Sequence, residues 1–254
     1  SLHDQVRGLF WKDGGPILGM QIENEYNLDG PGQGRAHIAA LKSLALKLGY
    51  DVPLYTVTGW DQTLYPKGEV VPVHGGYPDE PWSAKTTKLP PKENYLFRFD
   101  SRVSGDLGAQ TRNNRRGDAD DDMTDTPFLG AEYGGGVPVM YRRRPLLAPA
   151  DVAAAVTTQV GSGVNLLGYY MFHGGANPLA QGRSLEETQR SGGYNDCPMI
   201  GYDFQAPIGQ YGEVNPVNAA LRPLHYFLDA YGDRLAPMAV HAPAIQPADK
   251  DDLA

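Results

Sequence analysis

Apolar positions along the chain alternate between helical and strand-like patterns. Apolar residues recur every three or four positions in four segments, which predicts helices over 1–11, 35–48, 149–159 and 216–231. Short apolar runs predict five buried strands over 16–25, 52–58, 69–74, 127–133 and 164–172. The connections are long enough to cross over between parallel strands, so the pattern favours an α/β fold.

The least regular part of the chain is 77–126. Its second half, from Asp106 to Asp125, is polar and contains the consecutive aspartates Asp120, Asp121 and Asp122. These aspartates lack the alternating spacing and the closing glutamate of a calcium loop. We therefore expect a solvated surface insertion there.

Composition and charge exclude several classes of protein. The 254 residues include 22 Lys and Arg against 30 Asp and Glu, a net charge of −8 without a basic stretch, which argues against a nucleic-acid partner. No apolar run is long enough to span a membrane. The single cysteine, Cys197, excludes an internal disulfide framework and a cysteine-rich metal site. A content of 31 Gly and 21 Pro is typical of a loop-rich α/β enzyme.

Two glutamates stand at the ends of apolar strands, where α/β enzymes place their chemistry. Glu25 ends the first predicted strand and Glu132 the fourth. Glycosidic bond cleavage needs two such carboxyl groups, one to protonate the leaving oxygen and one to attack the sugar or activate water. The alternative is that each glutamate faces a loop or forms an ion pair. No glycine-rich phosphate turn followed by a helix is present, which disfavours a nucleotide site.

Five motifs carry a resemblance to a known family. In order they are GPILGMQIENEY at 15–26, EYGGG at 132–136, NLLGYYMFHGGANP at 165–178, YDFQAPI at 202–208 and LRPLH at 221–225. Together they closely resemble glycoside hydrolase family 35, the β-galactosidases, and the EYGGG form resembles a bacterial branch of it.

The resemblance implies a function and a site. It implies retaining exo-hydrolysis of terminal non-reducing β-D-galactose through a covalent glycosyl-enzyme intermediate, with Glu25 as acid/base and Glu132 as nucleophile. Asn24 would then bind the sugar hydroxyl beside the anomeric carbon, and Tyr170 would hold the nucleophile or the sugar. Neither a cofactor nor a metal is expected, and the partner is a β-galactoside.

Some site residues have two interpretations. Strand alternation would put Glu23 on the same side as Glu25, so it is either a second sugar ligand or a carboxylate paired with a cation. Trp60 is either a stacking wall for the sugar or a packing residue. His74 and His173 are expected at the rim as hydrogen-bonding residues. At two further positions this chain has a residue that differs from those common in the family.

Those departures concern the sugar site. Phe204 stands where the family commonly has a tyrosine, which removes one phenol, and Gly134 stands where some members have an aromatic residue. They leave open another terminal β-linked sugar, such as glucosamine. A non-catalytic remnant that binds sugar or a partner chain is a further alternative.

The resemblance also implies a domain organisation. Residues 1–240 would form a partial (β/α)8 TIM barrel, roughly strands 4 to 8, with the first three strands upstream of Ser1. Residues 241–254 would be a linker or the start of a following domain. An incomplete barrel exposes a parallel edge, so we expect either a missing N-terminal portion or self-association to cover it. The resemblance also implies that the parent protein is secreted or periplasmic.

Overall fold

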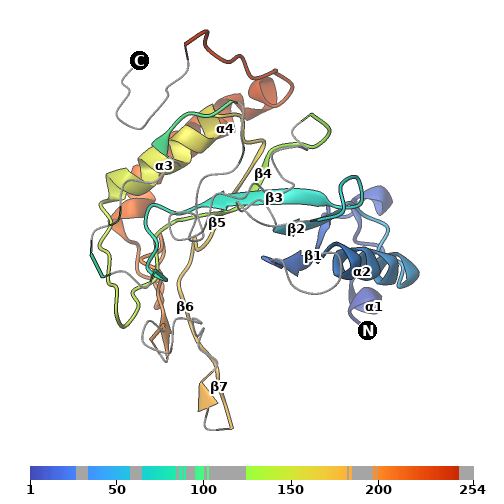
Figure 1. Ribbon diagram of the computed structural model, residues 1–254, viewed down its shortest axis with the longest axis horizontal. Coiled ribbons are helices and arrows are strands. Elements are labelled where there is room, and N and C mark those ends of the chain that lie inside the picture. Colours follow the sequence, from blue (N-terminus) through green and yellow to red (C-terminus); the bar gives the residue numbers. More distant parts are fainter. Residues whose placement is uncertain are drawn as a thin grey trace.

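A sheet of five parallel strands forms the centre of the molecule (Figure 1). The computed structural model describes residues 1–26, 34–57, 65–83, 86–87, 89, 95–99, 102, 124–181, 183–184, 197–198 and 200–245. The strands lie in chain order: β1 (Met20–Asn24), β2 (Leu54–Val57), β3 (Val71–Gly76), β4 (Leu129–Tyr133) and β5 (Leu166–Tyr169). Each neighbouring pair is parallel, so the predicted α/β class is confirmed.

The predicted helices are present with adjusted ends. They are α1 (Leu2–Val6), α2 (Arg35–Lys47), α3 (Pro149–Gly161) and α4 (Pro216–Leu235), and a short 3-10 helix, η1, covers Trp11–Asp13. The prediction of one helix over 1–11 is wrong beyond Val6, because Arg7 is extended and Gly8 has a φ of 82°. Proline begins both α3 and α4, where a missing N–H has no helical partner to lose.

Two small antiparallel pairs lie beyond the carboxyl ends of the sheet. β6 (Gly175–Ala176) pairs with β9 (Gly201–Tyr202), and β7 (Leu179–Ala180) pairs with β8 (Arg183–Ser184). Strands of two residues carry no periodic signal, so the apolar pattern did not predict them. The β6–β9 pair brings the segment after β5 beside residues 201–208.

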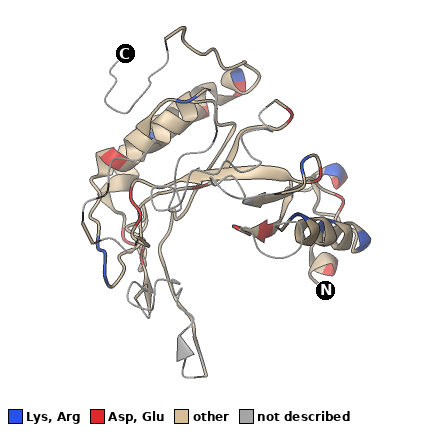
Figure 2. Ribbon diagram, viewed as in Figure 1, with Lys and Arg blue, Asp and Glu red and all other residues tan. Residues whose placement is uncertain are grey.

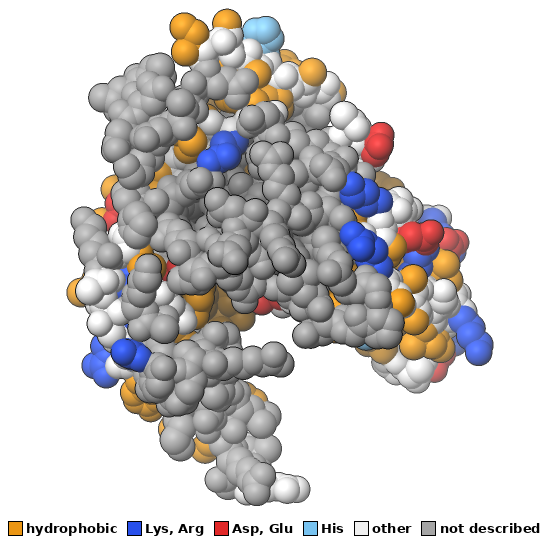
Figure 3. All heavy atoms as spheres, viewed as in Figure 1, with side chains coloured by type: hydrophobic (Ala, Val, Ile, Leu, Met, Phe, Trp, Pro, Cys, Tyr) orange, Lys and Arg blue, Asp and Glu red, His pale blue; other side chains and the backbone are white. Residues whose placement is uncertain are grey.

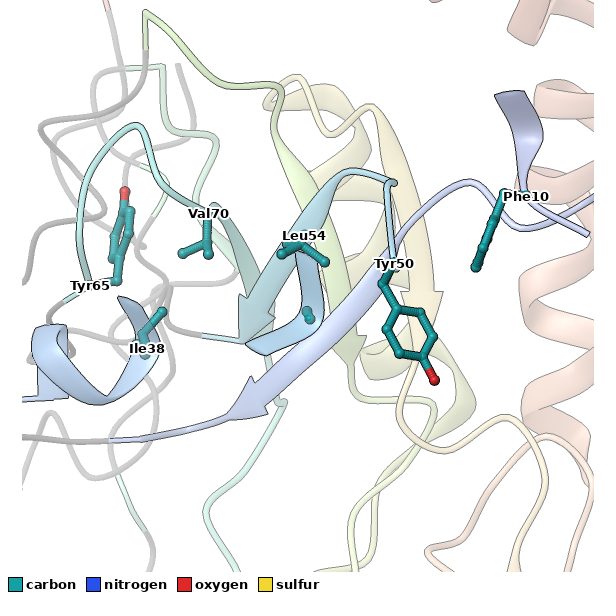
Figure 4. Close-up of a cluster of buried hydrophobic side chains, with 7 residues drawn as sticks. Phe10, Ile38, Tyr50, Leu54, Tyr65 and Val70 are labelled. Carbon is teal, nitrogen blue, oxygen red and sulfur yellow. The ribbon is translucent and has the colours of Figure 1, made fainter. Parts of the chain in front are cut away.

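The helices cover one face of the sheet, which we call the outer face. Against β1 and β2, a cluster of buried side chains joins α2 to the sheet and to the N-terminal segment (Figure 4). Its members are Phe10, Ile38, Ala45, Tyr50, Leu54, Tyr65 and Val70. Against β4 and β5, α3 and α4 lie side by side and bury Tyr133, Val152, Val156, Val217 and Leu221 (Figure 1). Burial of these side chains fixes which way each strand faces.

The opposite face, which we call the inner face, has its own cluster. Val73, Tyr77, Val137, Phe204 and Ala206 are buried there, with Tyr55, Leu129 and Tyr170 packed against them. No helix contributes to this cluster among the described residues. Loops that follow the strands cover it instead, so this is the face where polar chemistry can meet the sheet.

Hydrophobic side chains also reach the surface. Figure 3 shows them over α1 and α2 and over the segment after α4, where Met238, Val240 and Ile245 are exposed. No helix in the described part of the chain is both long and apolar enough to cross a bilayer. Of the expected surface insertion, residues 106–123 lie outside the described residues.

Candidate active site

Glu132 lies on the inner face near the end of β4. It stands opposite Gly75 of β3 in the sheet register, and only 8% of its surface is exposed. The phenol of Tyr77 donates a hydrogen bond of 2.9 Å to its Oε2. A buried carboxylate needs such donors, because burial without a partner costs several kcal/mol (about 2–7 for a polar group). Glu132 is thus a buried carboxyl group held by a neighbouring strand's tyrosine.

Tyr77 is a site residue that the sequence reasoning missed. It directly follows β3, and burial raises its pKa well above the usual range. The negative charge and hydrogen bond of Glu132 raise that pKa further, followed by the charge of Glu25. The phenol therefore stays protonated and remains a donor. A signal was available, since Tyr77 follows an apolar strand just as the two glutamates do.

Aromatic rings pack against Tyr77 and against one another on the inner face. Phe204 is central: its ring centroid lies 5.2 Å from that of Tyr170, 5.6 Å from Tyr202 and 6.2 Å from Tyr77. The Tyr170 and Tyr202 hydroxyls lie 3.3 Å apart. Trp82 packs edge-on against Tyr77 at 5.0 Å. The wall is apolar apart from these hydroxyls, which is typical of surfaces that bind sugar rings.

The glycines that follow Glu132 permit this close packing. A Cβ on Gly134 would lie 2.9 Å from the Tyr77 ring, and one on Gly136 would lie 2.2 Å from the Phe204 carbonyl oxygen. Gly135 would meet the Met171 carbonyl at 2.4 Å. The loop after β4 can therefore touch Tyr77 and the 204–205 turn only because these residues lack side chains. Gly134 thus leaves room for the Tyr77 ring.

The carboxyl end of β1 carries the other predicted site residues. The side-chain amide of Gln21 donates to Asn24 Oδ1 at 2.9 Å, so these two side chains share the inner face. Asn24 itself is exposed. Glu25 follows directly, is half-buried, and has a φ of 51°, in the left-handed region that residues other than glycine rarely adopt. Such a conformation at a strand end is common at functional sites.

Glu23 contacts the first turn of α2. The register of β1 against β2 shifts between Gln21 and Glu23, which indicates a bulge. Glu23 Oε2 lies 2.6 Å from His37 Nε2 of α2, and Oε1 accepts the Asn24 backbone N–H at 2.9 Å. The register shift interrupts the alternation expected along this strand, and the contact with His37 is of the kind expected under the interpretation of Glu23 as a paired carboxylate. Figure 2 shows the acidic residues at this strand end.

The other predicted residues have different outcomes. Trp60 lies outside the described residues. His74 is completely buried within β3, edge-on to Phe128, so its expected place at the rim is wrong. Burial, with a smaller effect of the Arg102 charge, lowers the pKa of His74 to about 3. His173 bonds the Gly174 carbonyl through Nδ1. Among the described residues, no three His, Cys, Asp or Glu side chains gather in a way that would hold a metal ion.

Comparison with known proteins adds an independent finding. The family model of glycosyl hydrolases family 35 matches residues 1–228. Beta-galactosidase 17 of Arabidopsis thaliana is 27% identical over 220 residues, covering 86% of this chain and 28% of that protein. Beta-galactosidase 6 of Oryza sativa subsp. japonica is 31% identical over 228 residues, covering 86% of this chain and 20% of that protein.

The match has a defined extent. The chain spans 28% or less of the length of these curated relatives. The family match, by contrast, covers all five strands of the sheet and both glutamates. This chain therefore belongs to glycosyl hydrolases family 35.

Proposed function

We propose that this chain carries the catalytic pair of a retaining β-galactosidase, with Glu132 as nucleophile and Glu25 as acid/base. One observation carries the proposal: the Tyr77 phenol is hydrogen-bonded to Glu132 and lies within the electrostatic reach of Glu25. The charge of Glu25 contributes to the raised pKa of that phenol, which supports assigning both carboxyl groups to one site. The family membership and the names of the relatives, all beta-galactosidases, support the substrate class.

The two carboxyl groups have surroundings suited to different tasks. Glu132 receives the Tyr77 hydrogen bond, which favours the ionised form that a nucleophile needs. Glu25 sits on a strained backbone next to Asn24. In the proposed reaction Glu132 attacks the anomeric carbon while Glu25 protonates the leaving oxygen, and Glu25 then deprotonates the water that releases the sugar.

The proposed sugar site uses both strand ends. Asn24, whose Oδ1 is occupied by Gln21, would donate its amide N–H to the sugar hydroxyl beside the anomeric carbon. Tyr170 and Phe204 would line the sugar site beside Glu132, and Trp60 would supply a stacking wall. Glu23 would act through its bond to the Asn24 backbone rather than as a direct sugar ligand.

We further propose that the sheet supplies strands 4 to 8 of an eight-stranded barrel. Among the described residues, β1 and β5 are the edge strands and each pairs with one neighbour, as expected if they are strands 4 and 8 of a barrel. A barrel also accounts for helices on the outer face and for loops after the strands that gather over the inner face. Residues 1–240 would belong to this catalytic domain and 241–254 to a linker or following domain, of which 246–254 lie outside the described residues.

Covalent labelling tests the proposal. The chain is incubated with a 2-deoxy-2-fluoro β-galactoside that carries a good leaving group, and its intact mass is measured. We expect a stable adduct on Glu132 that is lost in Glu132→Gln and kept in the control Glu69→Gln, whose carboxylate pairs with Lys42 on the surface. Absence of an adduct in the unmodified chain, with sugar binding retained, would favour the non-catalytic remnant.

The same experiment addresses the choice of sugar. Phe204 replaces a phenol in the aromatic wall, which favours testing a second terminal sugar. A matched panel of activated β-galactosides, β-glucosides and β-glucosaminides is compared by labelling rate. Faster labelling by a sugar other than galactose would overturn the galactosidase assignment while keeping the catalytic pair.

A further inference from the structure

An ion pair next to the site ties two of its loops together. Arg143 lies in the loop after β4 and binds Asp79, which lies in the loop after β3. Its Nε donates to Asp79 Oδ1 at 3.0 Å, and its Nη2 donates to both Oδ1 and Oδ2 at 2.8 Å. Its Nη1 donates to the Thr87 carbonyl at 2.7 Å. Only 8% of Arg143 is exposed. This guanidinium therefore uses its planar fork on one partner and its remaining donors on a backbone carbonyl.

Tyr77 lies between two ties that join the same loops. Close to the sheet, the Gly134 N–H donates to the Gly76 carbonyl at 2.8 Å. Farther out, Arg143 holds Asp79, two residues beyond Tyr77. Gly134 also contacts the Tyr77 ring from the β4 side. The backbone that carries Tyr77 is thus restrained on both sides, and the phenol is directed at Glu132 on β4.

Stability alone is a weak reason for such a pair. Burying two charges costs several kcal/mol, and apolar replacements are often as stable. A bidentate arginine does supply geometric precision, which a reacting group requires to within about 0.5 Å. Lys12 and Asp51 form an ion pair at 2.6 Å on the surface, outside the candidate site, and this pair serves as a comparison.

We propose that the Arg143–Asp79 pair is a positioning device that aims the Tyr77 hydroxyl at Glu132. Arg143 and Asp79 are positioning residues in this scheme, because they act through Tyr77. The inference rests on the proposed function for its catalytic meaning, but the coupling itself concerns only these four side chains. The titratable groups around the phenol are Glu132, Glu25 and Tyr170.

The test measures the titration of Glu132 by carbon-13 NMR of labelled glutamate carboxyls in the whole chain, assigned with Glu132→Gln. Removing the phenol in Tyr77→Phe is expected to raise the Glu132 pKa, because the carboxylate loses a donor. Arg143→Met is expected to raise it in the same direction. In the double variant, Arg143→Met should add nothing to Tyr77→Phe, since its effect passes through the phenol.

Two results would overturn the proposal. One is an unchanged Glu132 titration in Arg143→Met. The other is an equal shift from Arg143→Met in the Tyr77→Phe background, which would mean that the arginine charge acts on Glu132 directly. Arg143→Lys keeps the positive charge but lacks the bidentate guanidinium, so it should still raise the Glu132 pKa by part of the amount expected for Arg143→Met. If Arg143→Met does not fold, Arg143→Lys and Asp79→Asn carry the same comparison, and Lys12→Met is the ion-pair control.

Labelling by the fluorinated galactoside gives a second readout. Arg143→Met and Tyr77→Phe should each slow labelling on the order of tenfold, and the double variant should be no slower than Tyr77→Phe alone. If the unmodified chain does not label, the proposed hydrolase function fails, while the NMR titration still decides whether Arg143 positions Tyr77.

Discussion

The two carboxyl groups of the site sit in contrasting surroundings. Glu132, on β4, is buried and bonded to Tyr77, whose ring packs against Phe204 and against Gly134 of the glycine-rich loop. Glu25, after β1, is half-buried and next to an exposed Asn24. Its neighbourhood is held by polar contacts that water can reach, such as that of Glu23 with His37. Packing therefore organises the end of β4, and hydrogen bonding organises the end of β1.

This difference matches a division of labour. A nucleophile must be aligned with one atom of the sugar, which favours a rigid, packed environment. An acid/base must exchange protons with the leaving group and then with water, which favours access to solvent. The comparison predicts that substitutions at the end of β4 and at the end of β1 will change activity and stability in different ways.

The largest expected effect is the loss of activity in Glu25→Gln and Glu132→Gln, and its dependence on the leaving group should distinguish the two glutamates. With a poorly activated galactoside, both Glu25→Gln and Glu132→Gln should lose about 10²- to 10⁴-fold in turnover. With a dinitrophenyl leaving group, Glu25→Gln should still accept the fluorinated sugar, because that group departs without a proton. Glu132→Gln should not be labelled. Equal loss of labelling in both variants would contradict the assigned roles.

The second prediction tests packing at the β4 end. Gly136→Ala should destabilise the fold by about 3 kcal/mol, because the new Cβ would meet the backbone oxygens of Phe204 and Gln205 at 2.2 and 2.5 Å. Urea unfolding measures the change. Gly232→Ala in α4 is the control, since the new Cβ would meet no atom of the other described segments within 4 Å and alanine favours the helix. A stable Gly136→Ala protein would show that the 204–205 turn is not tightly packed.

A third prediction concerns acid stability on the β3–β4 side. His74 has a pKa of about 3 in the folded protein because it is buried, against 6.5 in an unfolded chain. Between these values the unfolded chain binds more protons, so stability is lost as the pH falls below 6.5 and continues to fall until about 3. The loss should be about 2 kcal/mol at pH 5.

Urea unfolding of variants at pH 7.5 and pH 5 checks this origin. His74→Leu should reduce the pH dependence, and the exposed His241→Gln should leave it unchanged. An identical pH dependence in wild type and His74→Leu would assign the acid sensitivity to other groups.

The smallest effect is expected at the β1 end. Glu23→Gln should change the free energy of unfolding by less than about 1 kcal/mol, because the pair with His37 is partly exposed. Thermal unfolding at low and moderate salt measures it. A loss as large as that of Gly136→Ala would mean that the polar end is as tightly organised as the packed one, which would remove the contrast.

Local pattern predicted the elements and the two principal carboxyl groups. The apolar runs around Met20–Asn24 and Leu129–Tyr133 correspond to β1 and β4, and the helical spacing over 149–159 corresponds to α3. Such predictions succeed because burial against a neighbouring layer imposes a period on the chain itself. The five motifs likewise led to the family that the comparisons then showed.

Other features escaped the pattern because they depend on distant partners. The Glu23 carboxylate contacts His37 of α2 next to a shift in the strand register, and local spacing reports neither the shift nor the contact. His74 is buried because the neighbouring strand and Phe128 cover it, which no local spacing reports. Tyr77 was missed because its importance comes from Glu132, 55 positions away in the chain.

The sequence by itself determined the α/β class and the family, since these follow from periodicity and from contiguous motifs. Only the tertiary structure decided that Tyr77 holds Glu132, that Glu23 contacts His37 of α2, and that Arg143 ties the loops after β3 and β4. The physical reason is one of range. Periodicity records which face of an element is buried, whereas a hydrogen bond or ion pair between loops requires atoms from separate strands to meet within about 3 Å.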